Sequence, residues 1–369
     1  DHFPSFFTEV PFFGTVNQPD RVRRYLEAEA PDVIITTHFG MAMTLGYLRE
    51  LGYFSEVPVS WVHLDVLSNF FFYQVADYLD QVFLPNQGMV DKWADYIDPE
   101  KLTASGVPIM PAMLNRSEPT EFHSSSAQQL DPSLPTVMLM GGSMGALSYD
   151  QIISQISRHY ADKDQIQIVA VCGRNERARQ HLESWKTSDS QLEFPQNIRL
   201  VTTGYIGLSE LMELQSIADV IVSKPGGLSS FELLTTSKPT VLTEGIGIQE
   251  TRNAEYMANN GAALFLPKVD RIGETIKSVL EDPDMAGNLV SNAKRLSEEF
   301  RAERINEWVR NAQVLQPHRP ELPVLQRHLG RDEQTQKWWL SLITPTVRQC
   351  QVLLSGFRKM RDRQRNSGQ

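Results

Sequence analysis

The most informative stretch of this sequence is Ser223-Lys-Pro-Gly-Gly-Leu-Ser-Ser-Phe-Glu232. It follows an apolar run, Ala218-Asp-Val-Ile-Val222, that is typical of a buried strand, and a helix is predicted to begin at Leu228. A helix that starts at such a turn points its free N–H groups and the positive end of its dipole at whatever lies above the strand. Because two glycines allow the backbone to approach closely, the turn favours binding of a phosphate or a diphosphate.

Polar side chains that can hold hydroxyl groups follow this turn. Glu232 lies a little more than one helical turn beyond the glycines, and the stretch Gly247-Ile-Gln-Glu-Thr-Arg-Asn253 supplies Gln249 and Glu250. A carboxylate at Glu232 can accept both hydroxyls of a ribose, although the helix dipole alone also favours a carboxylate there. A diphosphate flanked by hydroxyls indicates a nucleotide sugar as the ligand.

The rest of the chain alternates strand-like apolar runs with helical segments, which predicts parallel sheets covered by helices. Upstream, strands are predicted at 32–37, 57–64 and 81–84, with a short extended piece within 101–110 and a helix at 40–51. Downstream, strands are predicted at 136–140, 166–171, 198–201, 220–222 and 240–242, with helices at 149–160, 176–185, 209–216 and 228–235. Ligands of doubly wound sheets bind at the carboxyl ends of the strands, where the glycine-rich motifs fall.

A chain of 369 residues is too long for one ordinary core and suits two domains. A polar segment at 115–134 is typical of a linker, so we predict one Rossmann-like domain at 1–130 and a second at 131–315. The second domain would end in a long amphipathic helix at 285–315. Residues 316–369 would form a Pro-containing linker and a basic amphipathic tail.

Composition narrows the class of protein. The net charge of −10 argues against general nucleic-acid binding by the whole surface. The two cysteines, Cys172 and Cys350, give no disulfide framework and fit a reducing compartment; Cys172, at a strand end, is interpreted as a buried structural thiol. No apolar run reaches the roughly 18 residues that cross a bilayer, and no signal peptide is evident.

Three further turns follow predicted strands. Gly141-Gly-Ser-Met-Gly145 is a glycine-rich strand-to-helix turn that favours a phosphate-binding or site-lining role. In Cys172-Gly-Arg-Asn175, Arg174 can pair with phosphate or be an ordinary surface arginine. In Gly204-Tyr-Ile206 the backbone can meet a nucleobase edge, or the two side chains can pack in the core.

Taken together and in order, these motifs resemble glycosyltransferase family 28, and within it the diacylglycerol glycosyltransferases, which include the plant monogalactosyldiacylglycerol synthases and the bacterial diacylglycerol glucosyltransferases. The resemblance covers residues from about 30 to 280 and has its most specific motifs in the second half. The segments that carry it are Asp32-Val-Ile-Ile-Thr-Thr-His38, Trp61-Val-His-Leu-Asp65, Gly106-Val-Pro-Ile109, Met140-Gly-Gly-Ser143, Val171-Cys-Gly-Arg-Asn175, Ser223-Lys-Pro-Gly-Gly227 and Gly247-Ile-Gln-Glu250.

The resemblance implies the two-domain GT-B fold, two Rossmann-like doubly wound domains facing a cleft, with a UDP-sugar held mainly by the second domain. The Tyr205-Ile206 loop would then meet uracil, Glu232 the ribose, residues 223–228 the diphosphate, and Gln249 with Glu250 the donor sugar. The expected donor-binding residues are Gly142, Ser143, Arg174, Tyr205, Ile206, Ser223, Pro225, Gly226, Gly227, Leu228, Glu232, Gln249 and Glu250. Enzymes of this kind invert the anomeric centre and need no metal and no cofactor, because the helix N-terminus takes the place of a cation.

Inversion by single displacement needs one general base that takes the proton of the acceptor hydroxyl. Three side chains at predicted strand ends of the first domain qualify: His38, His63 and Asp65. Asp65 aligns with the aspartate of the family's hydrophobic-Thr-Asp motif, in which His63 replaces the usual threonine. His38 matches a histidine of the plant enzymes only. We therefore expect Asp65 to be the base or an acceptor contact, with His38 as the next candidate.

Family members open with a strand and a Gly-x-Gly-His-type loop that this sequence does not contain. The chain begins at Asp1, and we expect the element to lie upstream of it. The alternative is a protein that lacks part of the machinery and binds a UDP-sugar without turning it over.

The function expected from the sequence is transfer of a hexose from a UDP-sugar to a lipid acceptor, diacylglycerol first, to make a glycolipid. The alternatives are an N-acetylhexosaminyltransferase acting on another lipid-linked acceptor and a non-catalytic UDP-sugar-binding protein. The basic segment at 348–365 either binds anionic lipid headgroups or is a solvated helix. A peripheral position on the cytoplasmic face of a membrane is expected, without nucleic-acid partners.

Overall fold

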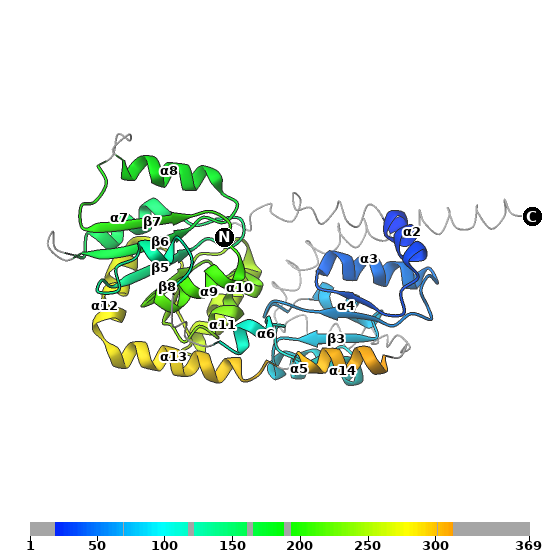
Figure 1. Ribbon diagram of the computed structural model, residues 1–369. Coiled ribbons are helices and arrows are strands. Elements are labelled where there is room, and N and C mark those ends of the chain that lie inside the picture. Colours follow the sequence, from blue (N-terminus) through cyan, green and yellow to red (C-terminus); the bar gives the residue numbers. More distant parts are fainter. Residues whose placement is uncertain are drawn as a thin grey trace, which may run out of the picture. The chain divides into compact units, whose positions relative to one another are not determined.

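The computed structural model describes residues 19–312, apart from 69, 117–121, 161–164, 188–192 and 301. Within them the chain builds two separate parallel sheets, which belong to one compact unit (Figure 1). The whole region 316–369, with its basic segment at 348–365 and Cys350, lies outside the described residues. No helix of the described part is long and apolar enough to cross a membrane.

The first sheet has the order β1-β2-β3-β4, and all its pairs are parallel. Its strands are β1 (Ile34–Thr36), β2 (Val59–Val62), β3 (Gln81–Leu84) and β4 (Leu102–Ala104), and the helices and 3₁₀ turn of this region are α2 (Pro19–Glu29), α3 (Phe39–Glu50), α4 (Phe70–Asp77), α5 (Gln87–Trp93), η2 (Pro99–Lys101) and α6 (Pro111–Leu114). β2 and β3 are buried along their whole length, as expected for parallel strands covered on both faces. The strands predicted at 32–37 and 57–64 are confirmed with trimmed ends, the strand at 81–84 has its predicted bounds, and the helix predicted at 40–51 is found at 39–50.

The second sheet has the order β10-β9-β8-β5-β6-β7, again parallel throughout. Its strands are β5 (Thr136–Met140), β6 (Ile166–Val171), β7 (Ile198–Thr203), β8 (Val220–Ser223), β9 (Thr240–Thr243) and β10 (Leu264–Leu266). Its helices and 3₁₀ turns are η3 (Ala127–Gln129), α7 (Tyr149–Ser157), α8 (Glu176–Lys186), α9 (Leu208–Ile217), α10 (Gly227–Leu233), α11 (Ile248–Asn259), η4 (Val269–Arg271), α12 (Ile272–Glu281), α13 (Pro283–Ser297) and α14 (Glu303–Asn311). The order reverses between β5 and β8, so the turns after these two strands flank the switch point at which such sheets bind ligands.

Alternation along each strand divides the second core into two layers. In β5, Met138 and Met140 face a layer made with α9, α10, α11 and α13, whereas Val137 and Leu139 face a layer made with α7, α8 and α12. Cys172 is completely buried in the second layer, and burial raises the pKa of its thiol to about 11. Its interpretation as a structural thiol agrees with both observations.

The long helix predicted at 285–315 is wrong, because the chain breaks it into α13 and α14. Phe300, between them, packs in the second core against Phe231, whereas Ile305 of α14 packs with Val62 and Phe83 of the first sheet. A single straight helix could not pack Phe300 into the second core and Ile305 against the first sheet. The predicted domain boundaries stay predictions, but α14 lies against the first sheet although the prediction assigned it to the second region.

The segment predicted as a linker is fastened to α9 over its described part. The backbone N–H of Ser124 donates to Oε2 of Glu213 at 2.9 Å, and Oγ of Ser126 donates to Oε1 of Glu210 at 2.7 Å. Ala127 packs into the second core. The polar composition that indicated a linker here supplies contacts to a helix.

Candidate active site

The turns after β5 and β6 are locked together at the carboxyl edge of the second sheet. The N–H of Arg174 donates to the carbonyl oxygen of Ser143 at 2.8 Å. Gly173 has φ +54°, and a Cβ there would lie 2.5 Å from the carbonyl oxygen of Gly142. Only glycine suits that contact, so Gly142, Ser143 and Arg174 are brought together as the sequence predicted.

The turn after β7 joins this group through an aromatic contact. The guanidinium carbon of Arg174 lies 5.1 Å from the ring centroid of Tyr205, a cation–π arrangement. Tyr205 is 65% exposed, whereas Ile206 packs against the second core. Core packing therefore holds for Ile206 and not for Tyr205, and the contact of this backbone with a nucleobase stays a prediction. Tyr205 is the side chain that a flat ligand can reach.

The turn after β8 is held by hydrogen bonds of the buried Ser223 side chain. Ser223 is completely buried, and its hydroxyl points at the carbonyl oxygens of Met140, at 3.2 Å, and Lys224, at 3.0 Å. Pro225 is buried beside it and Leu228 is 43% exposed at the start of α10. The Ser223 side chain thus ties the turn to β5, and a contact of that side chain with a donor stays a prediction.

An ion pair that the sequence analysis did not anticipate connects this turn to α11. Nζ of Lys224 lies 2.6 Å from Oε1 of Glu250, with 14% and 13% of the side chains exposed. Oε2 of Glu250 accepts from the N–H of Ile246 at 2.6 Å. Gln249 lies next to it, half-buried, beyond Gly247 at the start of α11. Lys224 belongs to the motif at 223–232 and Glu250 to the motif at 247–253, so the ion pair links these two motifs.

Glu232 lies on α10, half-buried. Burial raises the pKa of its carboxyl, and the charge of Arg116 acts in the opposite direction. Nη2 of Arg116 donates to Oε1 of Gln215 on α9 at 2.5 Å. A carboxylate in such surroundings is a stronger hydrogen-bond acceptor than one in water, which suits the ribose role predicted for it.

Asp65, just beyond β2 of the first sheet, reaches the turn after β8 of the second. Nδ2 of Asn253 donates to Oδ1 of Asp65 at 2.8 Å, and the N–H of Val66 donates to Oδ1 of Asn253 at 3.0 Å. A Cβ on Gly227 would lie 3.1 Å from the same Asp65 oxygen. The candidate base and the predicted diphosphate turn are therefore neighbours.

The environment of Asp65 changes its acidity. Burial raises the pKa of its carboxyl, the hydrogen bond from Asn253 lowers it, and the charge of Glu250 raises it. The balance is upward. A carboxyl whose pKa is moved towards neutrality is suited to accept a proton from a hydroxyl.

His63 positions the segment that carries Asp65. Its Nε2 lies 2.9 Å from the carbonyl oxygen of Leu67, and its Nδ1 accepts from the N–H of Asp65 at 3.3 Å. Burial lowers the pKa of the ring to about 4, and the imidazole stacks on Trp61 with centroids 4.7 Å apart. The neutral ring uses both nitrogens for backbone contacts, so His63 is a structural histidine rather than the base.

His38 is exposed at the carboxyl end of β1. Its Nδ1 accepts from the N–H of Gly40 at 3.1 Å, in the first turn of α3, where helix N–H groups have no partner within the helix. The contact gives His38 a capping function, and its catalytic role stays a prediction.

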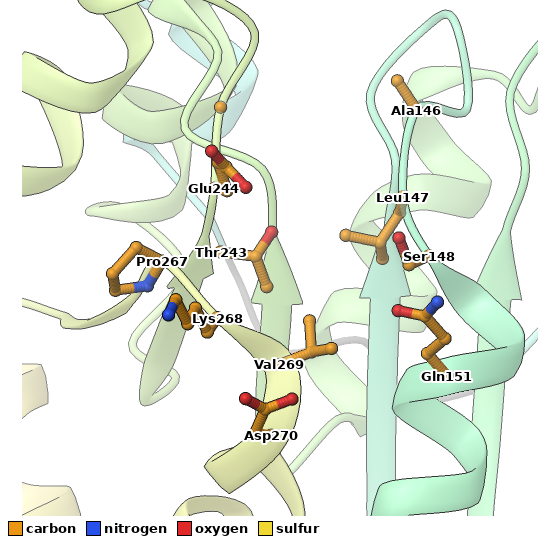
Figure 2. A pocket seen from close by; sticks show the side chains of 11 residues that line it. Ala146, Leu147, Ser148, Gln151, Thr243, Glu244, Pro267, Lys268, Val269 and Asp270 are labelled. Atoms are coloured by element: carbon orange, nitrogen blue, oxygen red, sulfur yellow. The ribbon is translucent and has the colours of Figure 1, made fainter. Parts of the chain in front are cut away.

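A pocket of about 550 Å³ opens at the same edge of the second sheet, on the side of α7 (Figure 2). Figure 2 shows residues 146–148 and Gln151 on one wall, with Glu244, Lys268 and Asp270 on the other. None of the predicted donor-binding residues lines it. The pocket is therefore a neighbour of the candidate site and not the site itself.

Comparison with known proteins supports the family indicated by the motifs. Residues 136–308 match the glycosyltransferase family 28 C-terminal domain. Over 279 residues the chain is 25% identical to the processive diacylglycerol beta-glucosyltransferase of Bacillus licheniformis. The aligned region covers 75% of this chain and 67% of that protein. The enzyme of the same name from Bacillus subtilis is also 25% identical, over 75% of this chain and 68% of that protein.

Solved structures show the same fold. The MurG structure from Acinetobacter baumannii has a TM-score of 0.55 at 15% identity and covers 81% of this chain and 79% of its own. The S. aureus MnaA–UDP co-structure has a TM-score of 0.60 at 13% identity and covers 83% of both chains. The GT-B prediction is confirmed.

Proposed function

The chain carries the C-terminal domain of glycosyltransferase family 28, and from this premise we propose that it is an inverting enzyme that moves a hexose from a UDP-sugar to a lipid hydroxyl. Glycosyl transfer follows from the family. The hexose, the acceptor and the residue roles are the proposal. One observation carries it: Asp65 of the first sheet lies beside the Gly226-Gly227 turn of the second, held there by Asn253.

In the proposed reaction the acceptor hydroxyl oxygen attacks the anomeric carbon of the donor from the face opposite the UDP. The new C–O bond forms as the bond from the anomeric carbon to the diphosphate oxygen breaks, and UDP leaves with the electron pair. Asp65 takes the hydroxyl proton on its carboxylate. Because only one displacement occurs, the configuration at the anomeric carbon is inverted.

The donor lies along the carboxyl edge of the second sheet. Uracil stacks near Tyr205 and meets the backbone of Ile206, the ribose hydroxyls donate to Glu232, and the donor sugar meets Gln249 and Glu250. The diphosphate lies among residues of three turns: Gly142, Ser143, Arg174, and Ser223 to Leu228. No metal or cofactor takes part in this proposal.

Diacylglycerol is the proposed acceptor, so the product is a glycolipid. The two Bacillus relatives carry that acceptor in their names. Apolar side chains stand exposed beside the donor-sugar residues, with Ile246 at 52% and Ile248 at 39%. The hydrocarbon chains of a lipid acceptor can bind to such an exposed apolar surface. The protein would act as a peripheral enzyme at the cytoplasmic face of a membrane.

The test is a transfer assay with the whole chain. Purified protein is incubated with radiolabelled UDP-glucose, UDP-galactose or UDP-N-acetylglucosamine and with vesicles that contain diacylglycerol, and the lipid extract is examined for labelled product. We expect label from a UDP-hexose in the lipid fraction, with and without EDTA. Label only from UDP-N-acetylglucosamine, or only on a polyprenyl-linked acceptor supplied in parallel, would replace the proposal by its nearest alternative. Binding of UDP without any transfer would contradict it.

A further inference from the structure

The Lys224–Glu250 ion pair occupies the middle of the proposed donor site. We propose that it is an exchangeable pair: Lys224 releases Glu250 when the donor binds, moves to the diphosphate, and leaves a carboxylate oxygen of Glu250 free for a hydroxyl of the donor sugar. The inference rests on the proposed function and deepens it. It assigns the diphosphate a second cationic side chain besides Arg174.

The position of Lys224 is the first argument. Its side chain passes between two glycine-rich turns: a Cβ on Gly142 would lie 3.1 Å from its Cε, and a Cβ on Gly226 would lie 3.3 Å from its Nζ. Side chains at these two places would crowd the lysine arm. The ammonium therefore lies at the surface of the turn predicted to hold the diphosphate.

The charges around it are the second argument. Glu250 lies 2.6 Å from Nζ, and Asp65 is close enough to Glu250 for the two charges to interact. A diphosphate entering beside these carboxylates would be repelled unless a cation faced it. Lys224 stands between the two turns and has an ammonium on a flexible stem that can change partners.

The two oxygens of Glu250 are the third argument. Oε2 accepts from the N–H of Ile246 at 2.6 Å, and only Oε1 faces Lys224. When Lys224 leaves, the Ile246 contact keeps the carboxylate in place. Oε1 then has a free lone pair directed into the site, where a sugar hydroxyl can donate to it.

If the pair exchanges partners, substitutions of Lys224 and of Glu250 should change the affinity for UDP in opposite directions. UDP carries the diphosphate but no donor sugar. In Lys224→Met the diphosphate loses one of its two cationic partners, so UDP affinity falls by about tenfold or more, the usual effect of losing a hydrogen bond to a charged group. In Glu250→Gln the lysine has no competing carboxylate, so UDP affinity rises by about threefold to tenfold. A pair that only braces the fold would lower UDP affinity in both variants.

The experiment is titration calorimetry of the full chain and its variants with UDP and with uridine. Wild type should bind UDP more tightly than uridine, Lys224→Met should reduce that difference and keep uridine binding, and Glu250→Gln should increase it. Lys277→Met and Glu281→Gln, which break an exposed ion pair on α12, are the matched controls and should leave both ligands unaffected. The thermal midpoint of each variant is measured first to confirm that it is folded.

The outcomes separate the inference from the function on which it rests. Weaker UDP binding in both pair variants, or no change in either, would overturn the exchange while leaving a UDP-binding protein. Failure of the wild type to bind UDP would overturn the proposed function itself.

Discussion

Nδ2 of Asn253, on α11 of the second sheet, donates a 2.8 Å hydrogen bond to Oδ1 of Asp65, which follows β2 of the first. Asn253 is completely buried, and its own Oδ1 accepts from the N–H of Val66. One amide side chain therefore fixes both the carboxylate and the backbone of the proposed base. The role of each group predicts a separate experimental result.

The pH dependence of transfer should report the raised pKa of Asp65. The base works as a carboxylate, so the rate should fall as the pH drops through that pKa, which lies above the value of about 3.9 of an unperturbed aspartate. The measurement is kcat/KM from about pH 4 to pH 9, with circular dichroism at each pH to show that the fold persists. An acid limb at or below the ordinary aspartate value would contradict burial as the dominant influence.

The same shift affects stability with a definite sign. A carboxyl whose pKa is higher in the folded than in the unfolded chain holds its proton more tightly when folded. Its contribution to stability is therefore largest below the unfolded pKa and is lost as the pH rises through the folded one. Asp65→Asn should remove this contribution to the pH dependence of unfolding.

Replacement of Asn253 by leucine should move the acid limb of the rate profile to higher pH. The variant removes the hydrogen bond that lowers the pKa of Asp65 and leaves the N–H of Val66 without its partner. Loss of these buried contacts should also lower the free energy of unfolding by about 1–3 kcal/mol. Denaturant unfolding and the pH profile are the measurements, and Asn311→Ala, on the exposed face of α14, is the control.

Glu232→Gln should weaken discrimination between UDP and its 2′-deoxy analogue. In wild type the proposed contact to the ribose hydroxyls should favour UDP by about tenfold, as expected for a hydrogen bond to a charged acceptor. The variant should bind the two nucleotides more equally. Unchanged discrimination in Glu232→Gln would remove the ribose assignment without affecting the rest of the site.

Gly173→Ala should destabilise the second domain by about 1–3 kcal/mol, because its φ of +54° and the nearby Gly142 carbonyl leave no room for a Cβ. The matched comparison is Gly287→Ala on α13, where a Cβ would meet nothing within 4 Å. That change should instead stabilise by about 0.5–1 kcal/mol, since alanine is the better helix former. Thermal midpoints of the two variants should move in opposite directions.

Much of the fold was predictable because buried parallel strands carry a strong local signal. Thr136–Met140, Ile166–Val171 and Gln81–Leu84 are apolar or β-branched apart from one glutamine in each of the last two, and their predicted bounds equal the observed ones. The break between α13 and α14 was not predictable in this way, because apolar residues recur on both sides of it and no glycine or proline stands between the two helices. The helix breaks because Phe300 packs in the second core whereas Ile305 packs against the first sheet. The local sequence pattern contains no information on this packing.

The site was predictable in its turns and not in its cross-connections. Gly142, Arg174 and Tyr205 come together because parallel strands end at one edge. The pairing of Lys224 with Glu250, and of Asp65 with Asn253, joins residues 26 and 188 positions apart. Such pairs depend on tertiary packing, and the sequence offered only that all four residues stand in its motifs.

The most direct test of the central claim compares wild type with Asp65→Asn, which has nearly the same shape and retains an oxygen to accept from Asn253. Transfer of hexose from UDP-hexose to diacylglycerol and the affinity for UDP are measured on both proteins. We expect wild type to transfer, and the variant to bind UDP as wild type does while its kcat falls by about 10²–10⁴-fold, the usual contribution of a general base. Equal transfer rates in the two proteins would contradict the account.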